Sequence, residues 1–492
     1  MSENKDTTAK QDNTGFSSVA WEEYNTERVN SWNRNAEKRR SFFDFSKYYH
    51  KRLSEVFRSN IPAGKRVLEL GSGSGDLLHS LKPSRGVGID FSVSKVNAAR
   101  SRYPELEFRL SDAHSFKSDE KFDYIILSDL INDVWDVQTI LENIRQASTP
   151  DTRVVLNFYS RLWQLPLDIA RKIRLIKPLL PQNWFTLHDV EALIKLSDYE
   201  IISHSSEIIF PVYIPLVSAF LNRVIAKIWP FKFASLTNFI VARPLIPQKD
   251  DGKKTVVSVV VAARNEAGNV PEIFRRIPQM ADGVELIFVE GGSTDNTYEA
   301  IEKERGNYPE LNCKLFRQTG VGKGDAVRLG FEKSTGDILM ILDADMTVLP
   351  EVLPRFVDAI VSGKGEFING VRLVYPMQKR AMRFFNLLGN KFFSLAFSWM
   401  LGQQIKDTLC GTKVLRKHHY EMICANRHFF GEFDPFGDFD LIFGSAKLNL
   451  KIIDLPVRYQ ERTYGTTNIQ RWKHGALLLK MFAFGTRKMK FS

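Results

Sequence analysis

Two aspartates stand one residue apart at the end of an uninterrupted apolar run. The run, residues 338–342, reads ILMIL and is followed by Asp343, Ala344 and Asp345. A continuous apolar run of this length indicates a central strand that is covered on both faces. Carboxylates at the end of such a strand offer the oxygen ligands that Mg²⁺ or Mn²⁺ prefers when it bridges phosphates. We therefore predict a metal site at Asp343 and Asp345, with an ordinary Asp-rich turn as the alternative.

A second candidate site begins at a glycine-rich turn. Residues 67–75 read VLELGSGSG, an apolar strand and then three glycines, which let a ligand approach the backbone closely. Asp90 ends the next apolar run and can accept hydrogen bonds from both hydroxyls of a ribose. Asp112 and Ser128 follow the two runs after that. The pattern predicts a nucleoside site formed by Gly71, Gly73, Gly75, Asp90, Asp112 and Ser128, with Glu69 in the strand before the turn and Ala113 directly after Asp112.

Both candidate sites lie where short apolar runs alternate with helix-like segments. In the first half the runs are residues 67–70, 86–89, 106–109, 124–127 and 154–158, with 200–209 and 236–242 as further strands. In the second half they are residues 256–262, 286–289, 313–318, 338–342 and 367–371. This alternation predicts two α/β, Rossmann-like domains, each with a parallel sheet and helices on both faces. The polar residues of each half then meet at the carboxyl edge of its sheet.

The polar segment PLIPQKDDGKKT separates the two halves. We place a linker at residues 244–255, a first domain at 16–243 that opens with helices over 16–64, and a second domain at 256–492. Residues 1–15 are polar and are predicted to be a disordered tail.

Composition narrows the classes of partner. The 492 residues are 43% hydrophobic, and 68 Lys and Arg against 57 Asp and Glu give a net charge of +11, a mild bias towards anionic partners such as nucleotides and phospholipids. There is no aromatic-basic RNA-binding motif, so we expect no nucleic-acid partner. Three cysteines are too few for a disulfide framework, and the polar N-terminus lacks a signal peptide, which predicts a cytoplasmic protein.

Three apolar or basic segments suit the surface of a membrane. No acid lies between Glu207 and Asp250, and residues 208–232 combine apolar side chains with three cations. Residues 387–401 are apolar and Phe-rich, and residues 462–492 hold seven Lys or Arg and no acid. The longest uncharged stretches, 208–222 and 392–405, are shorter than the ~20 residues of a spanning helix. Apolar faces beside basic residues suit an interfacial membrane helix, and with a lipid-linked acceptor we expect peripheral contact with the inner face of the membrane. Packing between domains and a homo-oligomer interface are the alternatives.

Residues 48–158 resemble a class I S-adenosylmethionine-dependent methyltransferase. The segment 69–75 looks like the cofactor turn of that family, Asp90 like its ribose-binding acid, and Asp112 with Ala113 like its adenine contact. The resemblance implies S-adenosylmethionine as a cofactor and leaves the methyl acceptor open. Asp129, Asp133 and His188 are candidate acid/base groups for an oxygen acceptor, and solvated loop residues are the alternative reading.

Residues 256–484 resemble a family 2 glycosyltransferase with a GT-A-like fold, most nearly the dolichyl- or polyprenyl-phosphate sugar transferases. The resemblance is carried by AARNE (262–266), VEGGSTDNT (289–297), GVGKGDA (320–326), DAD (343–345), DTLCGTK (407–413) and YQERTYGTTN (459–468). Two positions depart from the family pattern: Glu290-Gly291 replaces an acidic pair, and Thr347 replaces a glutamine.

The second resemblance implies a set of roles. The nucleotide sugar is bound by Arg264, Glu266, Glu290, Asp295, Lys323 and Asp343, with Mg²⁺ or Mn²⁺ on Asp343 and Asp345. Lys323 and Arg462 stabilise the leaving diphosphate. A hydroxyl acceptor requires a base, for which Asp438 is the first candidate and Asp440 the second. A lipid-phosphate acceptor requires none, and Arg372 and Arg383 are then candidates to bind it.

Together the two resemblances predict a bifunctional enzyme for the synthesis of a cell-surface polysaccharide or glycolipid. It would add a sugar to a lipid-phosphate or glycan acceptor and transfer a methyl group. One alternative is a glycosyltransferase whose first half only binds S-adenosylmethionine or acts as a scaffold. Another is a non-enzymatic membrane scaffold.

Overall fold

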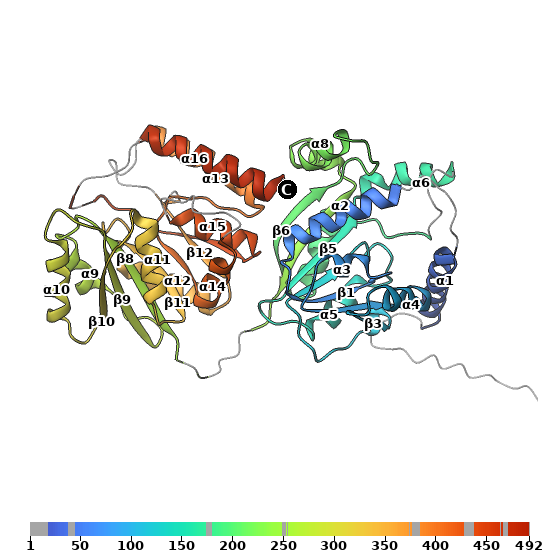
Figure 1. The fold of residues 1–492 in the computed structure, drawn as a ribbon, viewed down its shortest axis with the longest axis horizontal. Helices are drawn as coiled ribbons and strands as arrows, with labels where there is room; N and C mark the ends of the chain where they lie inside the picture. Colours follow the sequence, from blue (N-terminus) through green and yellow to red (C-terminus); the bar gives the residue numbers. More distant parts are fainter. Residues whose placement is uncertain are drawn as a thin grey trace, which may run out of the picture. The chain divides into compact units, whose positions relative to one another are not determined.

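The structure is a computed structural model that describes residues 18–37, 45–173, 180–247, 252, 254–372, 374–375, 384–427, 437–462, 464–465 and 471–491. The chain divides into two compact units, Met1–Ile246 and Pro247–Ser492 (Figure 1). The predicted tail, residues 1–15, lies outside the described residues, as do residues 248–251 and 253 of the predicted linker.

The first unit contains a seven-stranded sheet in the order β3-β2-β1-β4-β5-β7-β6. Its strands are β1 (Arg66–Leu70), β2 (Arg85–Asp90), β3 (Glu107–Leu110), β4 (Tyr124–Leu127), β5 (Arg153–Tyr159), β6 (Tyr199–Glu207) and β7 (Thr237–Pro244). Its helices are α1 (Ser18–Glu37), α2 (Phe45–Asn60), α3 (Asp76–Ser80), α4 (Val93–Arg102), α5 (Val137–Arg145), α6 (Gln164–Lys172), α7 (Leu187–Leu196) and α8 (Val217–Arg223). Short 3₁₀ turns are η1 (Ala113–Ser115), η2 (Arg161–Trp163), η3 (Ile225–Lys227) and η4 (Phe231–Ala234).

Hydrophobic cores cover both faces of this sheet. Leu68 and Leu70 of β1 face the core to which α5 contributes Ile140 and Ile144, whereas Val67 faces the core formed with α2. Because both faces are buried, the strands read as continuous apolar runs rather than as alternating ones. The order of the strands reverses between β1 and β4, and ligands of such sheets bind outside the carboxyl ends of the strands at this position.

The second unit repeats the plan with the order β10-β9-β8-β11-β13-β12-β14. Its strands are β8 (Val256–Ala263), β9 (Gly283–Glu290), β10 (Asn312–Arg317), β11 (Ile338–Asp343), β12 (Phe367–Val371), β13 (Lys413–Arg416) and β14 (Ile452–Pro456). Its helices are α9 (Val270–Arg276), α10 (Thr297–Asn307), α11 (Lys323–Lys333), α12 (Leu353–Val361), α13 (Phe384–Leu401), α14 (Lys417–Ala425), α15 (Asp438–Lys447) and α16 (Arg471–Gly485), with a 3₁₀ turn η5 (Pro350–Val352) and a π-turn η7 (Thr486–Lys490).

The prediction of two α/β domains is confirmed, with one correction to the sheets. Both sheets are mixed rather than wholly parallel, because β7 runs antiparallel to β5 and β6, and β13 runs antiparallel to β11 and β12. The chain joins β6 to β7 by residues 208–236 without crossing the sheet, and such a return makes an antiparallel neighbour. Strands β13 and β14 were not predicted.

The two Phe-rich helices α13 and α16 pack together in the second unit, where the ring centroids of Phe397 and Phe482 lie 5.9 Å apart. None of the helices within the described ranges is both long and apolar enough to cross a bilayer.

Candidate functional sites

The glycine-rich turn after β1 and the acid at the end of β2 meet as predicted. The backbone N–H of Gly73 donates to Oδ2 of Asp90 at 2.8 Å, and the N–H of Ser92 donates to Oδ1 at 2.8 Å. Gly71 has a φ of 72°, and a Cβ there would lie 2.9 Å from the side chain of Leu130. Glycine is therefore required at this turn, which holds the Asp90 carboxylate at the carboxyl edge of the sheet.

Glu69 lies beneath this turn. Its side chain is buried, and burial, with the neighbouring carboxylates of Asp90 and Asp76, raises its pKa well above the usual range. Its Oε2 atom has no hydrogen-bond partner among the described residues. A buried polar atom without a partner is costly, and a ligand that supplied one would recover that cost.

The other predicted nucleoside contacts follow the next two strands. Asp112 caps η1 and accepts hydrogen bonds from the backbone N–H of His114 at 2.7 Å and from Nδ1 of its ring at 2.8 Å. Burial opposes ionisation of Asp112, but these bonds lower its pKa. Ala113 is buried, and Ser128 is half-buried directly after β4. The sheet thus places all the predicted residues of this set along one edge.

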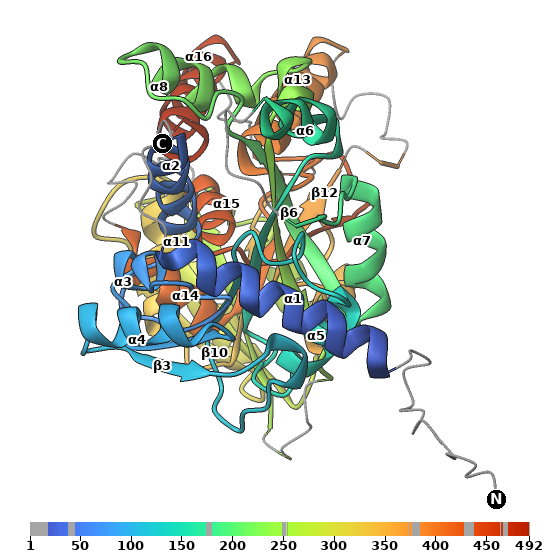
Figure 2. The ribbon, with the colours of Figure 1, turned by 90° about the vertical axis from the view of Figure 1, so that its right-hand side faces the viewer.

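Helix α1 covers part of the same edge, which the sequence did not indicate. Trp32 donates from Nε1 to Asp133 at 2.7 Å, Arg28 forms an ion pair with Asp133, and Ser92 donates to Oδ1 of Asn33 at 2.6 Å. The view in Figure 2 shows α1 lying across the strand ends of the unit. Asp133, a candidate acid/base group, is thereby held in an ion pair that ties α1 to the loop after β4.

Asp129 lies at the centre of a polar cluster after β4. The hydroxyl of Tyr49 donates to its Oδ1 at 2.8 Å, the side chain of Asn157 also donates to it, and its own N–H donates to Oδ1 of Asn157 at 3.2 Å. Asp129 has a φ of 52°, an uncommon conformation for a residue other than glycine. Burial raises the pKa of Asp129 and of the neighbouring Tyr159. His188, the third candidate acid/base group, is exposed on α7.

In the second unit, Asp343 ends β11 and lies against a glycine. Lys323, the first residue of α11, donates from Nζ to Oδ1 of Asp343 at 2.6 Å. A Cβ at Gly411 would lie 2.0 Å from Oδ2 of Asp343, so only glycine leaves room for this carboxylate. Burial opposes ionisation of Asp343, but the nearby cations of Lys323, Arg372 and Lys413 lower its pKa.

Asp345 is paired with the other predicted cation. Arg462 donates from Nη2 to Oδ2 of Asp345 at 2.7 Å, and its Nη1 lies 3.4 Å from Oε1 of Glu266. Thr347 donates from its hydroxyl to Oδ1 of Asp345 at 2.7 Å. Burial raises the pKa of Glu266. Three predicted residues from three distant segments, Glu266, Asp345 and Arg462, therefore form one cluster.

The loops after β8 and β9 lie beside this cluster. Asp295 accepts hydrogen bonds from the hydroxyl of Thr297 and, at 3.4 Å, from the hydroxyl of Tyr464. Glu290 is buried and accepts a hydrogen bond from the N–H of Ser293 at 2.5 Å. Arg264 is exposed in the same loop region. Tyr464 brings the closing segment of the motif at 459–468 onto the loops after β8 and β9, because it lies against Gly268 as well as Asp295; residues 463 and 466–468 lie outside the described residues.

A buried ion pair between Arg372 and Asp407 lies near Asp343. Arg372 donates from Nε to Oδ2 of Asp407 at 2.8 Å and from Nη2 to Oδ1 at 2.9 Å, and both side chains are almost fully buried. Lys413 is buried at the start of β13. This two-pronged pairing engages the Arg372 guanidinium, which was a candidate for binding a lipid phosphate, and Arg383 lies outside the described residues. Asp407 was expected only as part of the loop at 407–413, and nothing in the sequence indicates its partner.

The two candidate bases lie on α15. Gly437, the residue before α15, packs closely against Gly324 in the first turn of α11. A Cβ at Gly437 would lie only 2.5 Å from Cα of Gly324. Asp438 begins α15, and its side chain lies outside the described part of the chain. Asp440 is buried and accepts a hydrogen bond from Nε of Arg427 at 2.9 Å. Their role as bases remains a prediction.

Each unit contains a segment that matches the model of a known protein family. Residues 61–200 match the family model described as "Methyltransferase domain", and residues 258–423 match that of "Glycosyl transferase family 2". The chain carries a methyltransferase domain and a family 2 glycosyl transferase domain. The methyltransferase match spans β1 to the start of β6 and includes Asp90, and the glycosyl transferase match spans β8 into α14 and includes Asp343 and Asp345, whereas Tyr49 and Arg462 lie outside the matched residues.

Two curated relatives match the glycosyl transferase unit. Dolichol-phosphate mannosyltransferase of Pyrococcus furiosus is 29% identical over 249 residues, which are 48% of this chain and 67% of that protein. Undecaprenyl-phosphate 4-deoxy-4-formamido-L-arabinose transferase of Aeromonas hydrophila is 26% identical over 215 residues, 43% of this chain and 61% of that protein. The chain therefore spans about two thirds of the length of these relatives.

Among solved structures, magnesium protoporphyrin IX methyltransferase from Synechocystis PCC 6803 with bound SAH is 15% identical, with a TM-score of 0.33 over 46% of this chain and 98% of that one. The assignment of the methyltransferase unit rests on its family model.

Proposed function

We propose that the glycosyl transferase unit transfers a sugar from a nucleotide sugar to a lipid-phosphate or glycan acceptor with the help of Mg²⁺ or Mn²⁺. The observation that supports this most directly is the pairing of Lys323 with Asp343 and of Arg462 with Asp345 at one sheet edge. The named activities of the two relatives, which concern dolichol and undecaprenyl phosphates, support the acceptor class.

The residues at this edge suit a metal ion and a diphosphate together. Asp343 and Asp345 supply hard oxygen ligands, each with lone pairs beyond those already engaged. In the proposal Asp343 and Asp345 would hold the metal, and Lys323 and Arg462 would bind the oxygens of the diphosphate. A bound metal would neutralise the charge that develops on the leaving nucleoside diphosphate. Lys323 and Arg462 stabilise the same charge.

We propose further that the methyltransferase unit binds S-adenosylmethionine and methylates a hydroxyl. The glycine turn, Asp90, Asp112 and the unpartnered Oε2 of Glu69 support the binding site. When bound, S-adenosylmethionine supplies an electrophilic methyl group. The acceptor oxygen gains the methyl group, and its proton passes to Asp129, whose burial-raised pKa suits a proton acceptor. Tyr49 and Asn157 hold that carboxylate in place.

A first unit that binds S-adenosylmethionine without methyl transfer is the second candidate, favoured by the hydrogen bonds that already engage Asp129. An assay of the full chain with S-adenosylmethionine, UDP- or GDP-sugars and a polyprenyl phosphate separates the two. Release of both S-adenosylhomocysteine and a nucleoside diphosphate supports two transferases, and release of the diphosphate alone supports the second candidate. A lipid-phosphate acceptor also implies work at the inner face of the membrane, in the synthesis of a surface glycan or glycolipid.

A further inference from the structure

In the segment between β6 and β7, residues 208–236, several large apolar side chains are exposed and several polar side chains are buried, the reverse of what an ordinary surface segment shows. In α8 the buried residues are the polar Ser218 and Asn222, whereas Phe220 is 56% exposed and the preceding Leu216 is 87% exposed. In η3 the buried residues include Lys227, and the following Trp229 is 71% exposed. Apolar side chains outside and polar ones inside are expected where the outer surroundings are not water.

Hydrogen bonds inside the unit hold this orientation. Asn222 is fully buried, accepts a hydrogen bond from the N–H of Phe210 at 2.9 Å and donates to the carbonyl of Phe210 at 2.7 Å. Ser218 donates to the carbonyl of Val212 at 2.6 Å and accepts a hydrogen bond from the N–H of Ile214 at 2.6 Å. The polar side chains of α8 are thus used to fold the segment, which leaves its apolar side chains to face outwards.

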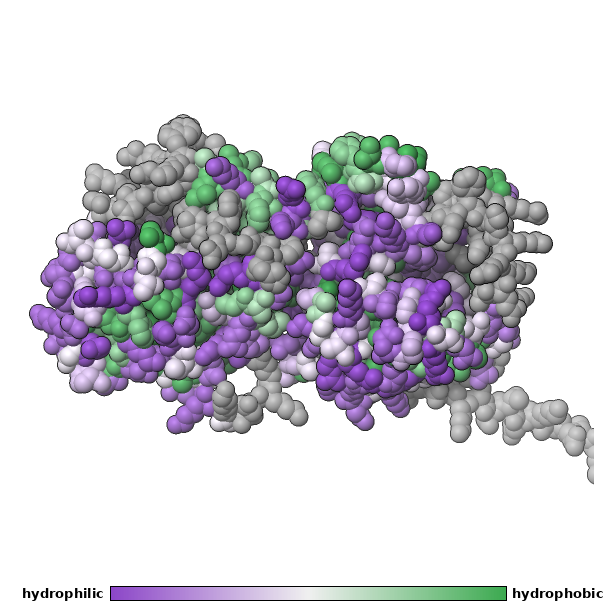
Figure 3. Space-filling view, viewed as in Figure 1, coloured by the Kyte–Doolittle hydropathy of each residue, from purple (hydrophilic) through white to green (hydrophobic). Residues whose placement is uncertain are grey.

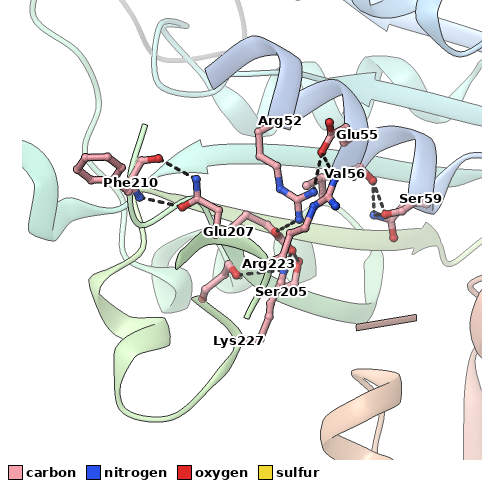
Figure 4. A network of polar contacts seen from close by, with 12 residues as sticks. Arg52, Glu55, Val56, Ser59, Ser205, Glu207, Phe210, Arg223 and Lys227 are labelled. Atoms are coloured by element: carbon pink, nitrogen blue, oxygen red, sulfur yellow. Dashed lines mark hydrogen bonds and ion pairs between the residues drawn. The ribbon is translucent and has the colours of Figure 1, made fainter. Parts of the chain in front are cut away.

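A network of ions fastens the same segment to α2 and β6 (Figure 4). Arg52 donates from Nη1 to Glu55 at 2.8 Å, and its Nη2 lies 3.7 Å from Glu207. From the segment, Arg223 donates to Glu55 at 3.2 Å, and Lys227 forms a buried ion pair with Glu207. Because removing one partner of a buried pair is strongly destabilising, the network keeps the segment fixed in one orientation.

Helix α6 extends the apolar surface. Leu165 and Ile169 are 73% and 60% exposed, and no residue of α6 is buried. The indole of Trp163 donates to the carbonyl of Ala234 at 2.9 Å and so joins the start of α6 to the end of the segment. Figures 1 and 2 both show α6 and α8 at the same end of the unit, and Figure 3 shows hydrophobic residues over α8. We call this surface the apolar platform, formed by Leu165, Ile169, Phe220, Trp229, Phe231 and Phe233.

The charges around the apolar platform favour an anionic partner. Residues 208–247 contain no acid, and Lys232 lies within the platform with its Nζ 5.2 Å from the ring centre of Phe233. The acid of α6, Asp168, forms an ion pair with Arg171, and Arg161 and Lys172 are exposed. In a symmetric dimer formed through this surface, the cations of one copy would lie close to the cations of the other. Their repulsion would oppose association. Tryptophan and basic side chains around apolar ones are typical of a surface that enters the headgroup region of a bilayer.

The segment that carries α8 and the Asp129 cluster contact the same turn of α2. Tyr48 accepts a hydrogen bond from Asn222 at 3.2 Å and contacts the ring of Tyr213 with centroids 5.6 Å apart. The adjacent Tyr49 donates to Asp129. One turn of α2 therefore contacts the platform segment through one tyrosine and the Asp129 cluster through the next.

We propose that the methyltransferase unit docks on an anionic bilayer through the apolar platform and there receives an acceptor carried by a lipid. The docking stands on the geometry of the platform alone, whereas delivery of the acceptor to Asp129 rests on the proposed methyl transfer. The apolar side chains enter the headgroup layer, and Lys232, Arg161 and Lys172 meet anionic phosphates.

The test is sedimentation of the full chain with vesicles of phosphatidylcholine alone and with vesicles that also contain phosphatidylglycerol. The wild type should bind the anionic vesicles at least tenfold more tightly. A variant with Phe220→Ser, Trp229→Ser and Phe233→Ser should lose at least tenfold of that binding, and Lys232→Glu should weaken it. Leu196→Ser removes a 68% exposed leucine from α7, outside the platform, and should change nothing. Binding of S-adenosylmethionine checks that each variant is folded.

The docking proposal would be overturned if the wild type did not bind anionic vesicles, or if the triple variant bound them as tightly as the wild type. It would also be overturned if the wild type formed a dimer that the triple variant lost, and neither protein bound vesicles. Release of S-adenosylhomocysteine is measured separately. Vesicle binding without such release would count against methyl transfer and leave the docking proposal standing.

Discussion

The ammonium of Lys323 lies 2.6 Å from a carboxylate oxygen of Asp343. The pair joins the first residue of α11 to the last residue of β11, so a cation of the protein holds the carboxylate that we assign to the metal. Lys323 would therefore compete with a bound metal for Asp343, and a diphosphate would give the lysine another partner.

This competition predicts opposite effects of Lys323→Met on two ligands. Without nucleotide, Mn²⁺ should bind the variant more tightly, because its competitor is gone. Binding of the nucleotide sugar should weaken by about 10-fold or more, the usual effect of losing a hydrogen bond to a charged group. Calorimetry with Mn²⁺ alone and with UDP- or GDP-sugars measures both. Lys333→Met, at the exposed far end of α11, is the matched control. Weaker Mn²⁺ binding by Lys323→Met would contradict the competition.

Gly411→Ala should lower the rate of sugar transfer by about 100-fold without unfolding the protein. The added methyl group would lie 2.0 Å from Oδ2 of Asp343 and must displace that carboxylate. A shift of about 1 Å in a catalytic group costs on the order of 100-fold in rate. Gly306→Ala, where a Cβ meets nothing within 4 Å, should leave the rate unchanged. The measurement is the rate of nucleoside diphosphate release, and equal rates for the two variants would show that Asp343 is not needed in its place.

Asp90→Asn should weaken binding of S-adenosylmethionine by ~10-fold or more, because the two backbone N–H groups at Asp90 and the ribose hydroxyls all require an acceptor. Asp198→Asn changes an exposed aspartate of the same unit and serves as the control. Unaltered affinity of Asp90→Asn in calorimetry would place the nucleoside elsewhere.

Glu285 should make the stability of the glycosyl transferase unit depend on pH. Burial opposes its ionisation, but Lys314, Ser258 and Thr335 donate to it and lower its pKa to about 2. Because the pKa of Glu285 is lower in the folded protein, its ionised carboxylate stabilises the fold at pH values above the pKa of the unfolded chain. This stabilisation is lost as the pH falls towards 2. Relative to the unfolded value, the ionised carboxylate contributes roughly 3 kcal/mol at neutral pH.

Urea unfolding of the wild type and of Glu285→Gln checks this. The difference in unfolding free energy should be largest at neutral pH and fall by roughly half near pH 3, because the unfolded chain takes up a proton on this carboxylate there while the folded protein keeps it ionised. A difference that is the same at both pH values would contradict the assignment.

Much of the fold and of both sites could be predicted because the signals are local. Strands buried on both faces read as apolar runs, and the residue after such a run, such as Asp90 or Asp343, lies at the carboxyl edge. The pairing of Arg28 with Asp133 spans 105 residues, and that of Arg372 with Asp407 spans 35, and neither leaves a local pattern. Strands β13 and β14 are short, and β13 begins with the buried Lys413, so neither forms a recognisable apolar run.

The central claim is that the chain holds two independent donor sites. Calorimetric titration of the full chain and of its Asp90→Asn and Asp343→Asn variants tests it most directly, with S-adenosylmethionine and with UDP- and GDP-sugars, each with and without Mn²⁺. We predict that Asp90→Asn loses only S-adenosylmethionine and that Asp343→Asn loses only the nucleotide sugar, whose binding alone requires the metal. A wild type that binds neither donor, or a variant that loses the ligand of the other unit, would contradict the claim.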